Sequence, residues 1–219
     1  MSLQKMYRLR DFDSSNLRDI ERLNLMYYHP EVMQAKGYWV EGFDFSKIGD
    51  LHKVEDTETK GCKKLNRQTK EIMYSVVDKL DHLVGWVWFY LDNKHVLPVS
   101  VKRSLGLNLL NCKTFEVSYQ KLMSSNWPLD LLAKVKYNTH LQLHKTRKGV
   151  IVAGLELALR KFKYQFRKVY GAKRKLVVYA YLTPDNLSSS KVLIRNGFNK
   201  YPRQYKYDGV MNDLWVKIV

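Results

Sequence analysis

Residues 184–198 read PDNLSSSKVLIRNGF, and they come directly after the apolar run LVVYAYL at 176–182. An apolar run of this length is typical of a strand that is buried on both faces. The segment after it predicts a short helix with Asn186 as its N-cap and Gly197 as the residue that ends it. Phe198 is then expected to pack behind the helix. A buried strand followed at once by a capped helix predicts an α/β fold.

A longer helix is predicted upstream, over residues 150–168. Its apolar side chains recur at helical spacing and form one stripe. The stripe consists of Val150, Ala153, Leu157, Ala158, Phe162 and Phe166. The segment that leads into this helix reads LQLHKTRKG at 141–149, so a basic, glycine-containing turn precedes the first helical residue.

The rest of the chain predicts mainly strands. Alternation and turn residues indicate a strand at 7–12, a helix from 14 to His29-Pro30, and a hairpin of strands at 71–78 and 83–91. Further strands are expected at 114–122, 134–144, 201–207 and 213–219, with a short helix and a loop within 31–70. The order favours an α/β (α+β) fold with a mixed, mostly antiparallel sheet and helices on both faces. We expect one domain over residues 1–219, with insertions near 92–113 and 123–138.

Composition sets limits on function. Apolar residues make up 45% of the 219, which excludes a disordered chain. No apolar run is long enough to cross a bilayer, and the first residues lack the apolar segment of a signal peptide, so we expect a cytoplasmic protein without membrane insertion. Cys62 and Cys112 are expected to be free thiols, and the cysteines and histidines show no metal-ligand spacing.

The formal charge is +17, from 38 Lys and Arg against 21 Asp and Glu. Such a charge favours a polyanionic partner such as nucleic acid, an anionic membrane surface or a phosphorylated cofactor, and it also fits a solvated basic surface. Residues 145–175 hold eleven basic side chains and one acid, Glu156, which is a local charge of 11 − 1 = +10. We expect the basic helix face to carry no exposed aromatic side chain, which favours a solvated face over a docking surface for RNA or an acidic protein.

Two segments resemble the GNAT superfamily, the acetyl-CoA-dependent N-acyltransferases. Asn186, Ser189 and the Gly197-Phe198 pair fall at the spacing of the family's Asn-x-x-Ser/Ala helix and Gly-Phe end, directly after a buried strand. The resemblance implies that Asn186 and Ser189 line the pantetheine arm of acetyl-CoA. The alternative from the residues alone is an ordinary capped helix.

The second segment resembles the family's pyrophosphate loop, Arg/Gln-x-x-Gly-x-Gly/Ala before a helix. The resemblance implies a cofactor site at Leu143, Arg147, Lys148, Gly149 and Val150, where helix N–H groups can hold phosphate. The chain departs from the pattern at two positions. Thr146 stands at the Arg/Gln position and Ile151 at that of the second small residue.

The resemblance implies direct transfer of an acetyl group to a primary amine, which needs a base and an acid. Glu116 is the candidate base on the strand before the loop, with His140 and His144 as rivals; the alternatives are an outward-facing carboxylate and a turn histidine. Leu193 occupies the position at which the family has the tyrosine that acts as the general acid.

The departure at Leu193 leaves three candidates for the acid: Ser190, Tyr205 or water. It also leaves a second class of function open. This is a GNAT-like chain with little or no turnover that binds nucleic acid or another polyanion. The acceptor stays open, and so does the choice between monomer and homodimer.

Overall fold

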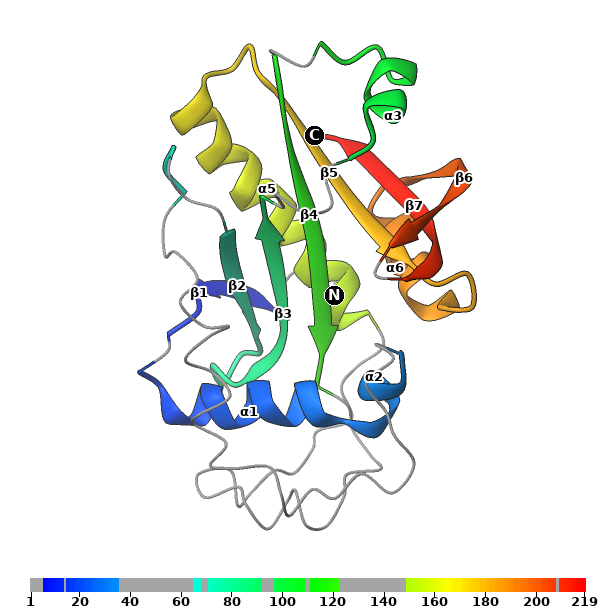
Figure 1. The fold of residues 1–219 in the computed structure, drawn as a ribbon. Coiled ribbons are helices and arrows are strands. Elements are labelled where there is room, and N and C mark those ends of the chain that lie inside the picture. Colours follow the sequence, from blue (N-terminus) through cyan, green and yellow to red (C-terminus); the bar gives the residue numbers. More distant parts are fainter. Residues whose placement is uncertain are drawn as a thin grey trace. The chain divides into compact units, whose positions relative to one another are not determined.

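The computed structural model describes residues 6–13, 15–35, 65–67, 71–91, 97–108, 111–122, 149–207 and 209–219. The elements, labelled in Figure 1, are β1 (Arg8–Asp11), α1 (Leu17–Tyr28), α2 (Pro30–Ala35), β2 (Glu71–Val77), β3 (Leu83–Tyr90), α3 (Val99–Ser104), β4 (Cys112–Lys121), α5 (Val150–Tyr170), β5 (Lys175–Leu182), α6 (Leu187–Arg195), β6 (Asn199–Tyr207) and β7 (Val210–Ile218).

Backbone hydrogen bonds join seven strands in the order β1-β2-β3-β4-β5-β7-β6. β1 pairs antiparallel with β2, and β7 pairs antiparallel with both β5 and β6. β4 and β5 run parallel, so the long helix α5 is the crossover between them. The mixed, mostly antiparallel sheet agrees with the fold class predicted from the sequence.

Contacts divide the chain into two compact units. Unit 1 comprises Met1–Gly61, Tyr74–Trp86 and Tyr119–Gly154, and unit 2 comprises Cys62–Met73, Val87–Ser118 and Leu155–Val219. β2, β3, β4 and α5 each contribute residues to both units. The single domain expected from the sequence stays a prediction.

In unit 1, α1 lies across one end of the hairpin that β2 and β3 form (Figure 1). Arg22 on α1 donates from Nη1 to the Leu83 carbonyl at 3.2 Å, and Gln120 on β4 donates from Nε2 to the Met26 carbonyl. Asp19 is buried and pairs with Arg10 on β1 at 2.5 Å. Buried polar groups of α1 thus fix the helix to three strands of the same unit.

The first turns of α5 come very close to the strands of unit 1. A Cβ on Gly154 would lie 2.7 Å from Cγ2 of Val76 on β2, and a Cβ on Gly85 of β3 would lie 2.8 Å from the Gln120 carbonyl oxygen and 3.1 Å from Cδ1 of Ile151. Only glycine fits without displacing these atoms. Two glycines therefore set how closely the helix approaches the sheet.

In unit 2, α5 covers one face of the sheet with aromatic side chains. The Phe162 ring stacks on Phe89 of β3 at 4.3 Å between centroids and meets the edge of Phe115 of β4 at 5.0 Å. Phe166 adds a second edge contact to Phe115 at 6.4 Å. These side chains are nearly inaccessible, so they form the core on this face.

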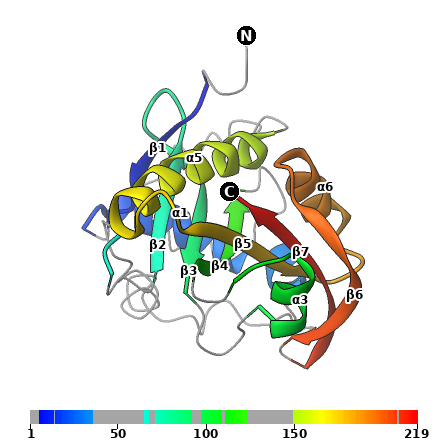
Figure 2. The same ribbon diagram turned by 90° about the horizontal axis from the view of Figure 1, so that it is seen from above.

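The opposite face of unit 2 is covered by α3. Its core cluster joins α3 and its flanks to β4, β5 and β7 through Leu97, Val101, Leu107, Cys112, Val177, Tyr179, Leu214 and Val216. We call this set the α3 cluster. Successive residues of a strand point to opposite faces, so Cys112 faces α3 whereas Phe115 faces α5. Helices on both faces of the sheet were expected and are present in unit 2 (Figure 2).

Most elements follow the sequence prediction, with shifts at their ends. α1 is capped by Asn16, whose Oδ1 accepts from the amides of Arg18 and Asp19, so the helix begins at Leu17 and not at residue 14 as predicted. On α5, Leu157 is only half-buried, whereas Leu155 and Leu159 are buried. Helix α3 was not predicted. The expected strand at 134–144 lies outside the described residues, as does the loop that follows α2.

Candidate active site

The parallel ladder between β4 and β5 ends before either strand does. Its register runs from Cys112↔Lys175 to Glu116↔Tyr179, whereas β4 continues to Lys121 and β5 to Leu182. On its other edge, β5 stays paired with β7 as far as Leu182↔Asp213. The last residues of β5 therefore remain paired with β7 after their pairing with β4 has ended. Glu116 belongs to the last residue pair between β4 and β5.

Glu116 is a buried carboxyl group with tyrosine hydroxyls beside it. Its side chain is 5% exposed, which contradicts the alternative of an outward-facing strand carboxylate. Tyr90, at the end of β3, is hydrogen-bonded through its hydroxyl to Glu116 and to Tyr207 of β6. Burial, and then the charge of Glu116, raise the pKa of Tyr90. The hydroxyl therefore keeps its proton at neutral pH and donates it to the carboxylate of Glu116.

Tyrosine rings extend this group along the sheet. Tyr181 of β5 stacks on Tyr207 at 4.6 Å between centroids, and Tyr179 meets Tyr181 edge to face at 5.9 Å. We call Glu116, Tyr90, Tyr181 and Tyr207 the Glu116 cluster; all four belong to unit 2. A carboxylate with aromatic faces and hydroxyls around it can bind an ammonium group and take a proton from it.

The start of α5 has the features of an anion site. Gly149 has φ 99°, in the region that favours glycine, and its carbonyl accepts from the Ala153 amide, so it leads directly into the helix. No acidic residue stands in the first turn of α5. The first N–H groups of a helix carry partial positive charge and bind phosphate well.

Val150 and Ile151 are both buried, and the Ile151 side chain packs toward Gly85 in the sheet. The bulky residue at the family's second small position therefore points into unit 1. The other predicted residues of this loop, Leu143, His144, Arg147 and Lys148, lie outside the described residues, as does His140.

The start of α6 has the predicted cap. Oδ1 of Asn186 accepts from the Ser189 amide at 3.1 Å and from the Ser188 hydroxyl at 3.1 Å. The cap uses only the oxygen of this amide, so Nδ2 is the atom that could donate to a ligand. Ser190 donates from Oγ to the Leu187 carbonyl at 3.0 Å within the helix. Its proton is therefore engaged, which weakens its case as a catalytic acid.

The end of α6 is also as predicted. Gly197 has φ 72°, and the Phe198 amide donates to the Leu193 carbonyl at 3.0 Å, which closes the helix. Leu193, at the family's tyrosine position, is fully buried and belongs to the core. Tyr205, the other candidate acid, packs against the α3 cluster.

Tyr90 and Tyr207 are the residues that the sequence did not reveal. They come from β3 and β6, and no spacing along the chain relates them to Glu116 on β4. Their position becomes visible only when the strand order is known. Tyr90 ends a strand rich in aromatic residues, and the structure gives its hydroxyl polar partners.

The basic face of α5 differs from the expectation in one respect. Tyr164 is 61% exposed, with the Lys168 ammonium 4.5 Å from its ring centroid. The expectation that no exposed aromatic side chain interrupts these charges was therefore wrong. The helix period places residue 164 one turn from Arg160 and Lys168, on the solvent side of the stripe that holds Phe162 and Phe166.

Two further findings apply to the described parts of the chain. No helix there reaches the length and apolarity needed to cross a membrane. No group of three or more His, Cys, Asp or Glu side chains among those residues is arranged to hold a metal ion. Cys112 is buried with a free thiol, and Cys62 lies outside the described residues.

The mixed sheet, with the parallel β4–β5 pair and the capped helix α6 after β5, has the arrangement of a GNAT fold. No protein-family model matches the sequence, and no curated protein matches it. Solved structures do match. An acetyltransferase of the GNAT family from Bacillus anthracis has a TM-score of 0.51 and 16% identity, with 98% of this chain and 94% of that chain covered.

Two further solved structures are similar to the same extent. The ribosomal L7/L12 alpha-N-protein acetyltransferase in complex with coenzyme A has a TM-score of 0.54 and 15% identity, covering 98% and 94% of the two chains. An aminoglycoside acetyltransferase in complex with coenzyme A has a TM-score of 0.53 and 11% identity, covering 97% and 94%. At these identities the likeness establishes the fold.

Proposed function

We propose that this chain is an N-acetyltransferase that moves the acetyl group of acetyl-CoA to a primary amine. The observation that carries the proposal is the parallel β4–β5 pair that ends at the buried Glu116, in a fold shared with acetyltransferases that bind coenzyme A. The residues present also fit the cofactor. The glycine entry to α5 suits a pyrophosphate, and Nδ2 of Asn186 can donate to an amide carbonyl of the pantetheine arm.

Acetyl-CoA, when bound, supplies a thioester whose carbonyl carbon accepts the amine, so that a C–N bond forms, the C–S bond breaks and the thiolate takes up a proton. The carboxylate of Glu116 takes the proton that the acceptor ammonium must lose, directly or through one water. The Tyr90 hydroxyl holds this carboxylate in place, and Tyr90 is held in turn by Tyr207, whose ring stacks on Tyr181.

Phosphate binding is assigned to residues 147–150, with Leu143 as a further contact. Ser189 lies beside Asn186 at the start of α6 and presents a small side chain to the pantetheine arm. The proton of the leaving thiol comes from water, from Tyr205 or from Ser190, and Ser190 would first have to release the Leu187 carbonyl. Should Glu116 not act, His144 is the next candidate base.

Release of free thiol from acetyl-CoA, measured with a panel of small amines and peptides, tests the activity directly. Gly149→Glu tests the cofactor site. The substitution adds a negative charge and forces a side chain onto φ 99°, so acetyl-CoA binding should be abolished in titration calorimetry. Gly171→Glu is a matched control, because that glycine has φ 83° and open space around it, at the far end of α5. Equal binding by both variants would remove this assignment.

A second candidate function is binding of RNA through the basic face of α5, with or without turnover. The observation that favours it is Tyr164, an exposed ring among Arg160, Lys161, Lys163, Arg167 and Lys168. Single-stranded nucleic acid is bound by cations along the backbone together with aromatic rings on which bases stack. An acidic protein would use the cations but would gain less from the ring.

A further inference from the structure

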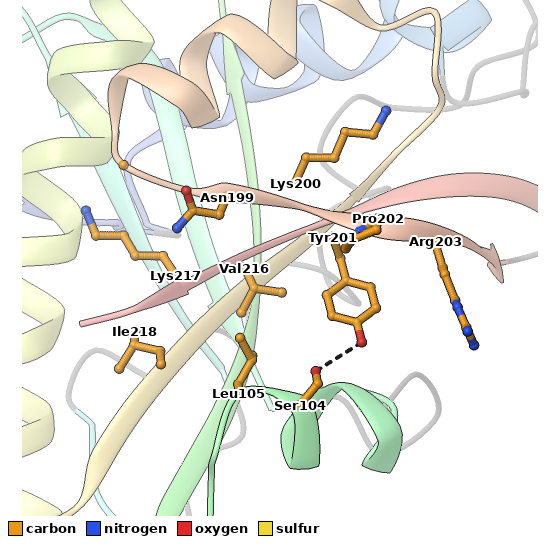
Figure 3. Close-up of a pocket in the computed structure, with 11 residues that line it drawn as sticks. Ser104, Leu105, Asn199, Lys200, Tyr201, Pro202, Arg203, Val216, Lys217 and Ile218 are labelled. Carbon is orange, nitrogen blue, oxygen red and sulfur yellow. Dashed lines mark hydrogen bonds between the residues drawn. The ribbon is translucent and has the colours of Figure 1, made fainter.

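A pocket of about 740 Å³ lies in unit 2 between the end of α3, the first residues of β6 and the last residues of β7 (Figure 3). Pockets for small molecules usually measure about 300–1,000 Å³. The residues that line it include neither Glu116 nor any residue assigned above to the cofactor. Its chemistry can therefore be considered separately from acetyl transfer.

Apolar side chains form one wall of the pocket. Leu105, Val216 and Ile218 approach one another between α3 and β7 (Figure 3). Val216 is buried in the α3 cluster, whereas Ile218 is 48% exposed although it is a large aliphatic side chain. The apolar wall thus extends from the buried α3 cluster to a surface that faces water. An apolar ligand bound in the pocket would cover that surface.

Two hydroxyl groups meet beside this wall. The Tyr201 ring extends from β6 toward α3, and its hydroxyl lies 3.0 Å from Oγ of Ser104 (Figure 3). Ser104 also donates from Oγ to the Val101 carbonyl at 2.9 Å, so within the pair Tyr201 donates and Ser104 accepts. Both protons are therefore in use, and the contact fixes the Tyr201 ring beside the apolar wall.

The charge of the lining is entirely positive. It contains Lys200, Arg203 and Lys217 and no carboxylate. Lys200 is already paired with Asp213 at 2.6 Å, and Lys217 donates to the Asn196 carbonyl. Arg203 forms no ion pair within the described part of the chain, and its side chain extends on the same side of β6 as Tyr201 (Figure 3). Its guanidinium offers two parallel donors that match a carboxylate or a phosphate.

The position of Arg203 follows from an irregularity in β6. The pairing with β7 shifts between Lys200 and Gln204, around Pro202, which lacks a backbone N–H. A bulge of this kind redirects the side chains beside it and leaves a local opening at the edge of a sheet. β6 is the last strand in the order that the described residues form, so no described strand lies beyond the opening.

From these features we propose that the pocket binds a small molecule that joins an apolar body to a carboxylate or phosphate group. The apolar body lies on Leu105, Val216 and Ile218, beside the Tyr201 ring, and the anionic group binds to Arg203. The proposal does not depend on acetyl transfer, because none of these residues has a role in that reaction.

Sodium octanoate is a suitable probe, with n-octylamine as the cation of equal chain length. Titration calorimetry of the full chain should show saturable binding of octanoate, no binding of octylamine, and no change when coenzyme A is present. Arg203→Ala should weaken octanoate binding roughly tenfold or more, the usual effect of losing a charge-assisted hydrogen bond. Arg195→Ala, at an exposed arginine of α6, is the matched control and should bind as the unmodified chain does.

A second variant tests the apolar wall. Ile218→Asp places a carboxylate on it at a half-exposed position, so the fold should persist by circular dichroism while octanoate binding is lost. Four results would each overturn the proposal: no octanoate binding, equal binding of octylamine, equal effects of Arg203→Ala and Arg195→Ala, or displacement of octanoate by coenzyme A. The last result would mean that the probe occupies the cofactor site.

Discussion

The surroundings of Glu116 are formed by side chains from three strands that are distant from one another in the sequence. Burial raises the pKa of Tyr90, and the charge of Glu116 raises it further, so the hydroxyl keeps its proton beside the carboxylate. A neutral donor stabilises the ionised form of its acceptor, so Tyr90 favours a carboxylate at position 116. A buried carboxylate with such a partner is a candidate for a residue that accepts a proton during the reaction.

The first prediction concerns this carboxylate. Glu116→Gln keeps the shape of the side chain and removes the base, so turnover with an amine acceptor should fall roughly 100-fold or more while acetyl-CoA affinity is unchanged. Steady-state kinetics and calorimetry measure the two quantities. Glu156→Gln, which removes an exposed carboxylate on α5, should leave both unaffected. An unaffected rate in Glu116→Gln, together with loss of activity in His144→Ala, would transfer the role to His144.

Tyr90→Phe separates a positioning role from a structural one. Loss of the hydroxyl removes a hydrogen bond that favours the ionised carboxylate, so the acidic limb of the pH profile of kcat/KM should move to higher pH. Above that limb the rate should recover. A uniform loss of rate at every pH, with the limb in place, would show that Tyr90 does not act through Glu116.

Asn186 has two functions that different substitutions can separate. Asn186→Ala removes the cap of α6, which usually costs about 1 kcal/mol of stability, and also the Nδ2 donor. Asn186→Ser restores a cap oxygen without that donor. Both variants should weaken acetyl-CoA binding roughly tenfold in calorimetry, and only the alanine variant should lower the melting temperature. If the serine variant binds the cofactor normally, Asn186 is a helix cap and no more.

At the scale of single residues, the sequence predicts the helix caps at Asn186 and Gly197 but not the tertiary contacts of Glu116. Asn186 and Gly197 act through neighbours within one turn, so local spacing is sufficient to find them. Glu116 could be named as a candidate from its strand, but its burial depends on β3 and β6, which contribute Tyr90 and Tyr207. Tertiary contacts of this kind have no signature in the spacing of residues.

At the scale of elements, the approach of α5 to the sheet depends on Gly154. Gly154→Ala should lower the free energy of unfolding by about 1–2 kcal/mol. The new Cβ would lie 2.7 Å from a methyl of Val76, and overpacking of a core usually costs about 1–3 kcal/mol, which exceeds the gain of up to about 1 kcal/mol from better helix propensity. Urea unfolding measures the change.

Val76→Ala provides the cycle that tests the cause. It makes room for the added methyl group, so the double variant should lose less stability than the sum of the two single variants. Additive losses would show that the two side chains do not compete for space. Since position 154 follows the first turn of α5, the single alanine variant should also weaken acetyl-CoA binding if the helix start holds the pyrophosphate.

Elements with strong local patterns were predicted well, and their ends less well. β2, β3 and β5 are apolar runs bounded by turns, and all three lie within a few residues of their predicted ranges. β6 begins before its predicted start, because the bulge around Pro202 interrupts the alternation that defines a strand. α3 is only a short helix, VSVKRS, and a segment of this length carries too little periodicity to be recognised.

The sheet order could not be read from the chain in the same way. The order of the predicted strands and helices favoured a mixed sheet, and the parallel β4–β5 pair, joined through the crossover helix α5, agrees with it. The placement of β7 between β5 and β6 is a consequence of the β6–β7 hairpin folding back onto β5. Only that placement puts Tyr207 near Tyr181 and Tyr90.

At the scale of the whole molecule, the charge of +17 is unevenly distributed along the chain. Within the described residues 149–175 there are eight basic side chains and one acid, and that acid is paired with Arg160 at 2.5 Å. A phosphorylated cofactor at the start of α5 accounts for little of this charge, because Arg167 and Lys168 stand in the last turn of the helix. Among the remaining cations, the Lys168 ammonium lies 4.5 Å from the centroid of the exposed Tyr164 ring.

This distribution leads to the final prediction. If the face binds RNA, filter binding of a single-stranded RNA should weaken steeply as salt rises, because each phosphate contact releases counterions. Charge reversal at Lys163, Arg167 and Lys168 lowers the net charge from +17 to +11 and should flatten the slope of log K against log salt by about 2, from three lost contacts at about 0.7 each. Tyr164→Ala should weaken binding by roughly tenfold at every salt concentration without changing the slope, because stacking is not ionic.

Charge reversal at Lys191, Arg195 and Lys206 is the matched control, since it changes the net charge equally at exposed positions away from α5. Equal slopes in the two triple variants would mean that RNA responds to net charge alone, and no retention at low salt would leave the face of α5 as a solvated surface.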